Sequence, residues 1–176
     1  MKKGQLLSQP FFYIFAIVTI GLLLVFGFNY VGKIMKTGCE VEGLDFNNKI
    51  QAKINELITL SAGSSFECAV TRASGTTKNS CELVLPDSAL GVCFIDTDKG
   101  YQQNDISFKE IKTLVTALGR GAHKNMFFAP PPNAQCKSEP VKLKKLTTEG
   151  AVCVDPKLKK TFILESLGDE VIVKKA

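Results

Sequence analysis

The side chains with the clearest chemical potential in this chain are its six cysteines. All of them come after residue 38, no two form a Cys-x-x-Cys pair, and the chain has a single histidine. A structural zinc site needs four such ligands at short spacings, so a set of disulfides outside the reducing cytoplasm is the better interpretation. We expect disulfide bonds among these residues: Cys39, Cys68, Cys81, Cys93, Cys136 and Cys153.

One pairing follows from the strand pattern. Residues 65–72 and 80–86 are typical of two β-strands, and a hairpin across residues 73–79 would place Cys68 opposite, or nearly opposite, Cys81. Cross-strand neighbours at such separations can form a disulfide. We therefore predict a bond between Cys68 and Cys81. The other four cysteines allow three pairings, among which the sequence does not choose.

A second pattern with potential chemistry is Asp96-Thr97-Asp98-Lys99-Gly100. Two aspartates at i and i+2 before a glycine resemble the start of a calcium loop, in which alternating oxygens surround a hard cation. No glutamate closes the loop at the expected distance. The pattern favours a turn at the end of a strand, and a calcium site held by Asp96 and Asp98 is the alternative. No cofactor is expected.

Motifs of established catalytic chemistry are absent from the sequence. It contains no G-x-S-x-G, S-x-x-K or H-E-x-x-H motif and no phosphate-binding glycine loop. We therefore expect no catalysis. The alternative is an anchored enzyme, which would need a pocket that gathers several of five side chains: Asp96, Asp98, Asp105, Glu110 and His123.

These residues all follow a long apolar segment. Residues 5–32 carry no charged side chain, and lysines flank the run at both ends. As a helix, the part from Pro10 to Val31 would rise roughly 33 Å, about the thickness of the hydrocarbon core of a bilayer. A secretory signal usually has a shorter apolar region that ends at a small-residue cleavage site. We expect residues 5–36 to form a retained transmembrane helix, with the lipid bilayer as its partner.

The flanking charges leave the orientation of this helix open, because Lys2, Lys3 and the amino terminus oppose Lys33 and Lys36. The cysteines favour a cytoplasmic amino terminus and an extracytoplasmic carboxy-terminal domain. Without the four flanking lysines, 22 − 4 = 18 basic residues stand against 17 acidic ones. A domain with a net charge near +1 has no general electrostatic reason to bind nucleic acid.

The segment after the membrane helix is predicted to be a linker and a helical stalk over residues 37–63. Gly38 to Gly43 is expected to interrupt the helix. An amphipathic helix then begins at the N-cap Asp45 and stops at Gly63. Its apolar stripe consists of Ile50, Ile54, Leu57 and Ile58.

The remaining residues, 64–176, are predicted to form a disulfide-stapled, mainly antiparallel β domain, sandwich-like and of the α+β class, with one or two amphipathic helices. A helix is expected over residues 107–118, with a capping box at Ser107 and Glu110 and a stop at Gly119. Period-two patterns predict eight short strands. They cover residues 65–72, 80–86, 91–96, 125–130, 140–146, 150–155, 160–166 and 170–175.

The amino end, Met1-Lys2-Lys3-Gly4-Gln5, resembles the class III (prepilin-type) leader of archaeal type IV pilin-like proteins. The resemblance implies that residues 1–4 are removed by cleavage between Gly4 and Gln5, and that the apolar helix then packs in a filament. Gln9 stands where such proteins usually carry a glutamate. The chain also resembles uncharacterised single-span exported proteins of small-genome archaea, for which no activity is implied; the matching segments are SQPFFYIFAI, LVLP, VCFID and NMFF.

The function expected first is therefore that of a membrane-anchored cell-surface protein with a structural or binding ectodomain. A pilin-like subunit of a surface filament is an alternative, and its partners would be copies of itself. The anchored enzyme is another alternative. An accessory subunit of a membrane complex is the last, and its partner would be another membrane protein.

Overall fold

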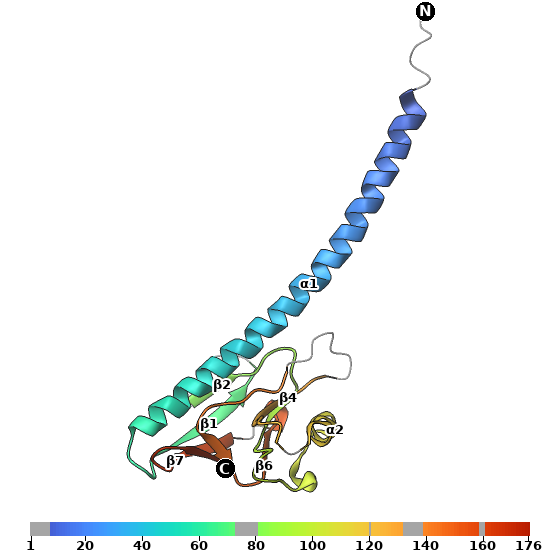
Figure 1. The fold of residues 1–176 in the computed structure, drawn as a ribbon. Helices are drawn as coiled ribbons and strands as arrows, with labels where there is room; N and C mark the ends of the chain where they lie inside the picture. The colour runs from blue at the N-terminus through green and yellow to red at the C-terminus, as the bar shows by residue number, and fades with distance from the viewer. Residues whose placement is uncertain (1–7, 73–80, 120, 132–138, 159–160) are drawn as a thin grey trace, which may run out of the picture. The chain divides into compact units, whose positions relative to one another are not determined.

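The computed structural model describes residues 8–72, 81–119, 121–131, 139–158 and 161–176. The chain divides into two compact units, Met1–Gly38 and Cys39–Ala176, called here the first and the second unit. Helix α1 (Ser8–Thr59) contributes residues to both units, and the strands and shorter helices belong to the second (Figure 1).

In the first unit, α1 exposes large apolar side chains from Phe11 to Ile34. The stretch Pro10–Ile34 is long and apolar enough to cross a membrane, a test of length and composition that signal sequences also pass. Two polar side chains in this stretch bond within the helix. Thr19 Oγ1 donates to the carbonyl of Phe15 at 2.8 Å, and Asn29 Nδ2 donates to the carbonyl of Val25 at 3.0 Å. Such internal partners suit a helix in apolar surroundings.

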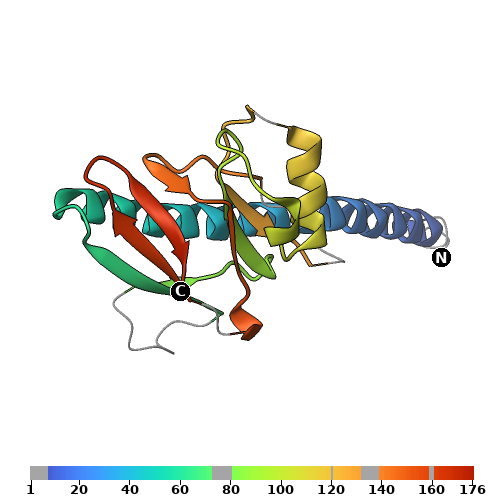
Figure 2. The same ribbon diagram turned by 90° about the horizontal axis from the view of Figure 1, so that it is seen from below.

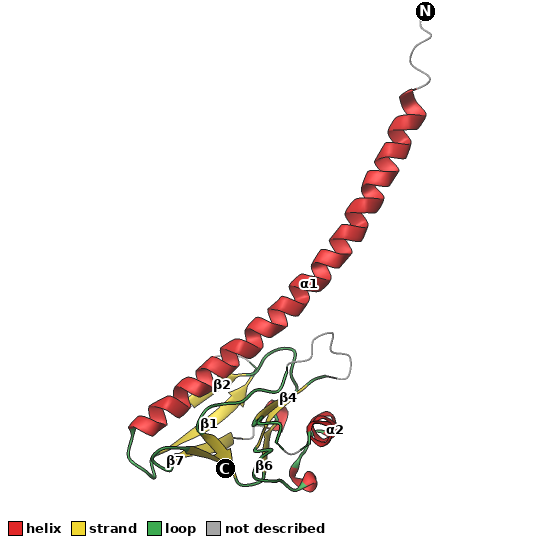
Figure 3. Cartoon of the chain, viewed as in Figure 1, coloured by secondary structure: helices red, strands yellow, loops and turns green. Residues whose placement is uncertain are grey.

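Helix α1 continues through Gly38–Gly43, so the predicted interruption is wrong (Figure 3). A glycine inside a helix costs only about 1 kcal/mol relative to alanine, and none of the residues between the two glycines is a proline. Asp45 consequently lies inside the helix and is not its N-cap. Its carboxylate instead pairs with Lys49 one turn later, at 2.7 Å.

The last part of α1 buries one stripe in the main core of the second unit. Ile50, Ile54 and Leu57 are fully buried, as predicted, and Ile58 packs partly buried against the same core. Phe46 extends the stripe by one more turn and is 1% exposed. Spacings of four and three residues keep these side chains on one helix face. The predicted stalk helix is therefore part of the core.

A five-stranded sheet has the order β2-β1-β7-β8-β5. Its strands are β1 (Ser65–Thr71), β2 (Cys81–Val84), β5 (Leu146–Thr148), β7 (Thr161–Ser166) and β8 (Val171–Lys175). β7 pairs antiparallel with β1 and with β8, whereas β1 with β2 and β5 with β8 are parallel. The predicted hairpin of β1 and β2 is therefore wrong, because alternation predicts the faces of a strand but not the direction of its neighbour.

A second, antiparallel sheet has the order β4-β3-β6, with β3 (Gly91–Ile95) between β4 (Met126–Ala129) and β6 (Ala151–Val154). Val92 and Phe94 of β3 face the main core, and Cys93 and Ile95 face a second apolar cluster that includes α2 (Lys109–Leu118). Figure 2 shows α2, in yellow, beside this sheet. Burial on both faces explains why these strands appear in the sequence as unbroken apolar runs.

Two local predictions need correction, and one is confirmed. α2 begins after Phe108, and in the described part of the chain no side chain caps its start, so the capping box at Ser107 and Glu110 is wrong. The stop is confirmed: Gly119 has φ +71° and its N–H donates to the carbonyl of Val115 at 3.1 Å. The strand predicted at 140–146 is displaced to β5, and Val141 forms an isolated bridge with Met126.

We expect Gly91→Ala to lower the free energy of unfolding by about 1–3 kcal/mol, the usual cost of overpacking a core. A Cβ at this position would overlap the ring of Phe108 and lie 2.7 Å from the carbonyl oxygen of Val154. Urea denaturation followed by circular dichroism measures the change. Gly38→Ala is the control, because a Cβ there meets nothing within 4 Å; an equal effect of the two variants would contradict the prediction.

Candidate functional site

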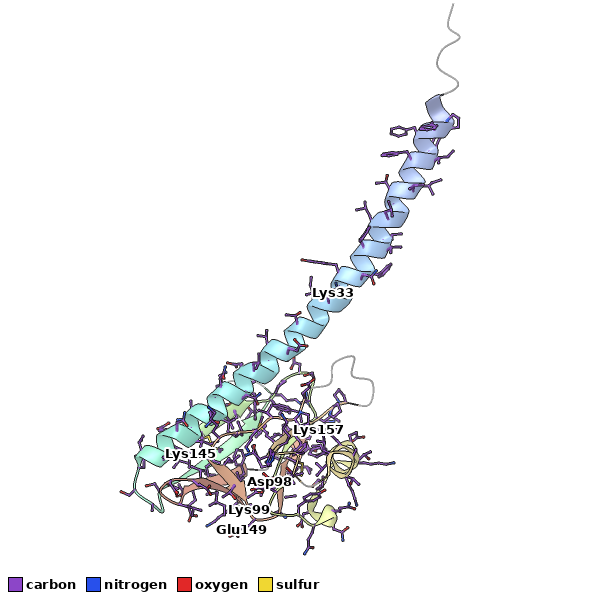
Figure 4. The ribbon with its side chains drawn as sticks, viewed as in Figure 1. Lys33, Asp98, Lys99, Lys145, Glu149 and Lys157 are labelled. Carbon is purple, nitrogen blue, oxygen red and sulfur yellow. A yellow bond between two sulfur atoms is a disulfide. The ribbon has the colours of Figure 1, made fainter. Side chains whose placement is uncertain are left out.

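Asp96 and Asp98, which the sequence singled out as a candidate calcium site, lie in the turn that follows β3. Asp96 Oδ1 accepts a hydrogen bond from the backbone N–H of Asp98 at 3.0 Å, which closes a local turn. Asp98 Oδ2 lies 2.9 Å from Nδ1 of His123, at the surface. Three of the five candidate catalytic residues are thus close together; Figure 4 labels Asp98 and its neighbour Lys99.

Hydroxyl groups of β5 hold this turn in place. The N–H of Asp96 donates to Thr148 Oγ1 at 3.0 Å, and the ammonium of Lys99 donates to Thr147 Oγ1 at 2.7 Å. Thr147 Oγ1 also lies 3.5 Å from Asp96 Oδ2. Both threonines are buried. Asp96 and Lys99 of the turn therefore have partners inside the fold.

Asn125, which no sequence pattern singled out, organises the backbone beside this turn. Its side chain is buried, with Nδ2 donating to the carbonyls of Leu143 and Leu146 at 2.8 and 3.1 Å. Its Oδ1 accepts from the N–H of Leu143 at 2.7 Å. One amide thus satisfies three buried backbone groups and ties the segment before β5 to the start of β4. We name the contacts of Asp96, Lys99, Asn125, Thr147 and Thr148 the polar seam.

We expect Asn125→Ala to lower the free energy of unfolding by about 2–3 kcal/mol, because it leaves three buried backbone groups without their partner. Thermal or urea unfolding followed by circular dichroism checks this value. Asn104→Ala is the matched control, since Asn104 is exposed, and surface changes usually stay within about 0.5 kcal/mol. Equal stability of the two variants would refute the role assigned to Asn125.

The remaining candidate catalytic residues do not join the turn. Asp105 Oδ1 lies 3.7 Å from the ammonium of Lys175, and Glu110 is exposed in the first turn of α2. The described residues contain no group of three or more His, Cys, Asp or Glu side chains that could hold a metal ion. Residues 96–100 are interpreted from the sequence either as a turn at the end of a strand or as a calcium site. The turn accounts for the hydrogen bonds described above.

The two described disulfides each join residues that are paired across neighbouring strands. Cys68 and Cys81 are partners in the β1–β2 register, with Cα atoms 4.5 Å apart. The predicted bond is thus present, although on parallel strands. Cys93 and Cys153 are partners in the β3–β6 register, with Cα atoms 4.0 Å apart.

Cys136 and the side chain of Cys39 lie outside the described part of the structure, so their pairing stays a prediction. Because the other four cysteines are joined in two bonds, we expect Cys39 to pair with Cys136. Peptide mapping without reduction tests this, and the linked peptide should be found. Alkylation of either residue in the unreduced protein would contradict the prediction. Gly4 and Gln5, at the predicted cleavage site, are also outside the described residues.

Comparisons with protein-family models, curated proteins and solved structures find no match to this chain. Its own features therefore carry the functional argument. An apolar helix near the amino end together with two disulfides indicates a membrane-anchored or secreted protein.

Proposed function

We propose that this chain is a single-pass membrane protein with a cytoplasmic amino terminus. Its second unit then lies on the extracytoplasmic side of the membrane and serves a structural or binding role. The observation that carries the proposal is that the apolar stretch and the disulfides lie in different parts of the chain. The apolar stretch Pro10–Ile34 lies in the first unit, and both described disulfides lie in the second.

The exposure of the apolar stretch supports an anchor. Phe11, Phe15 and Leu23 are each at least 67% exposed, and no residue of the stretch is buried. Soluble proteins rarely leave so large an apolar surface in contact with water. A bilayer would cover it, and the internal hydrogen bonds of Thr19 and Asn29 remove part of the cost of placing polar groups there.

The disulfides support the proposed orientation, because such bonds persist outside the reducing cytoplasm. The polar seam stabilises the second unit itself. Lys99 and Asp96 contact the hydroxyls of β5 and hold two segments of the second unit together.

The continuity of α1 favours a second candidate, a pilin-like subunit of a surface filament. A single helix runs from the apolar stretch into the core of the second unit, where it buries Phe46, Ile50 and Leu57. A helix of this kind can exchange lipid for the helices of neighbouring copies while its other part stays fixed to a folded domain. The partners would then be copies of this chain, and the leader would be cut between Gly4 and Gln5.

The test is made on membranes of cells that produce the full chain. We expect the protein to resist extraction with alkaline carbonate and its cysteines to react with an alkylating agent only after reduction. Release by carbonate would overturn the anchor, and alkylation before reduction would overturn the orientation. The intact mass then separates the two candidates: loss of residues 1–4 supports the filament subunit, and the full-length mass supports the plain anchor.

A matched pair of variants tests whether the apolar stretch is the anchor. Leu22→Lys should reduce the membrane-bound fraction, since a lysine at the centre of a membrane helix costs about 2.5–3.5 kcal/mol. Leu118→Lys places the same charge at an exposed leucine of α2 and should leave that fraction unchanged.

A further inference from the structure

The two described disulfides differ in how far their sulfur-bearing residues are buried. Cys68 and Cys81 are both fully buried in the main core, in the same cluster as Phe46 and Phe162. Cys93 is fully buried in the second cluster, but its partner Cys153 is only partly buried at the border of that cluster. Among the four cysteines of the described disulfides, Cys153 is the one that is not fully buried.

The position of Cys153 explains its exposure. It lies on β6, which is at the end of the strand order β4-β3-β6. β6 is followed by Asp155 and a short 3₁₀ helix, Pro156–Leu158, in which Lys157 and Leu158 are exposed. Thiol–disulfide exchange begins when a thiolate attacks one sulfur of the bond, and access to that sulfur limits the rate. Because Cys153 is the less buried of the two partners and lies on an outer strand, its sulfur is the point at which a small thiol would attack.

We propose that the Cys93–Cys153 disulfide is a thiol-exchange site, attacked at the sulfur of Cys153 by small thiols and dithiols. The attacking sulfur forms a mixed disulfide with Cys153, and the bond to Cys93 breaks. Cys93 leaves as a thiolate and takes up a proton. A second thiol then attacks the mixed disulfide and releases Cys153 as a thiol. In total, two reagent thiols are oxidised to one disulfide and the protein disulfide is reduced to two thiols.

The pairing of β3 with β6 allows the disulfide to open while the sheet around it stays folded. The register also pairs Val92 with Val154 and Phe94 with Val152, one residue to each side of the bond. Both pairs contribute side chains to the main core. These contacts remain when the sulfur bond opens, so β6 keeps its place in the folded unit. By contrast, exchange at Cys68–Cys81 requires exposure of the main core, which is a much rarer opening.

The experiment uses the oxidised full-length chain in detergent micelles. Dithiothreitol is added in steps, and samples are quenched with acid and unfolded before free thiols are labelled with N-ethylmaleimide and peptides are mapped. Far-ultraviolet circular dichroism of the unquenched protein records the fold. We expect Cys93 and Cys153 to be labelled at least about tenfold faster than Cys68 and Cys81, without loss of the dichroism signal. Equal rates, earlier labelling of Cys68 and Cys81, or labelling of Cys93 and Cys153 only with loss of the fold would each overturn the proposal.

The point of attack is tested separately with glutathione. Brief exposure followed by acid quenching should give a mixed disulfide on Cys153, and a glutathione adduct found mainly on Cys93 would refute the assignment. The variant Cys68→Ala/Cys81→Ala is the matched control. It lacks the buried bond and should show the same exchange rate at Cys93–Cys153 as the unchanged chain; a changed rate would refute independent, local exchange.

Discussion

Replacing Phe46 with alanine is expected to lower the free energy of unfolding of the second unit by about 3–5 kcal/mol, the usual cost of truncating a buried aromatic side chain. Phe46 is 1% exposed, and its ring meets that of Phe128 edge to face, with centroids 5.3 Å apart. Phe128 belongs to β4, so this contact joins α1 to the three-stranded sheet. Its loss removes apolar burial, an aromatic contact and the link between two elements at once.

The measurement is urea denaturation of the full chain in a mild detergent, followed by circular dichroism. Phe46→Leu keeps most of the volume and should cost less than about 1.5 kcal/mol. Leu44→Ala is the matched control on the same helix, because Leu44 is 59% exposed, and it should change stability by no more than about 0.5 kcal/mol. If Phe46→Ala behaves like Leu44→Ala, this part of α1 does not pack in the main core of the second unit.

The double substitution Cys93→Ala/Cys153→Ala, which removes the disulfide bond between these residues, is also expected to lower the free energy of unfolding strongly. Its cysteines are 60 residues apart, and those of the Cys68–Cys81 bond are 13 apart. A cross-link restricts the unfolded chain more when the closed loop is longer. The expected contribution to the free energy of unfolding is therefore about 4 kcal/mol for the Cys93–Cys153 bond and about 3 kcal/mol for the Cys68–Cys81 bond. We therefore expect the double alanine variant at Cys93 and Cys153 to be the less stable one.

Both double variants are compared by urea denaturation of the oxidised proteins. The opposite order would mean that packing of sulfur in the main core, where Cys68 and Cys81 are fully buried, outweighs the difference in loop length. A negligible effect of both substitutions would contradict the view that the disulfides stabilise this unit.

Local sequence patterns predicted those features that depend only on residues a few positions apart. The stripe of Ile50, Ile54 and Leu57 and the stop at Gly119 are of this kind. Gly38 and Gly43 misled the prediction, because two isolated glycines cost less than the packing of the helix that follows them contributes.

Long-range partners could not be predicted from the same patterns. The parallel pairing of β1 with β2 depends on how β7 completes the sheet on the other side of β1, about 90 residues later in the chain. The polar seam was missed for a similar reason. Asn125 contacts residues 18 and 21 positions away, and Asp96 contacts one 52 positions away, distances at which no spacing rule applies.

The order in which the chain is made bears on how the second unit forms. Its main core contains Phe46 from the start of the unit and Val173 from the last few residues of the sequence, and β1 needs β7 as its neighbour. A chain emerging from the ribosome would thus present the α1 stripe long before the residues that cover it exist. Folding of this unit must wait until nearly all of it has been synthesised.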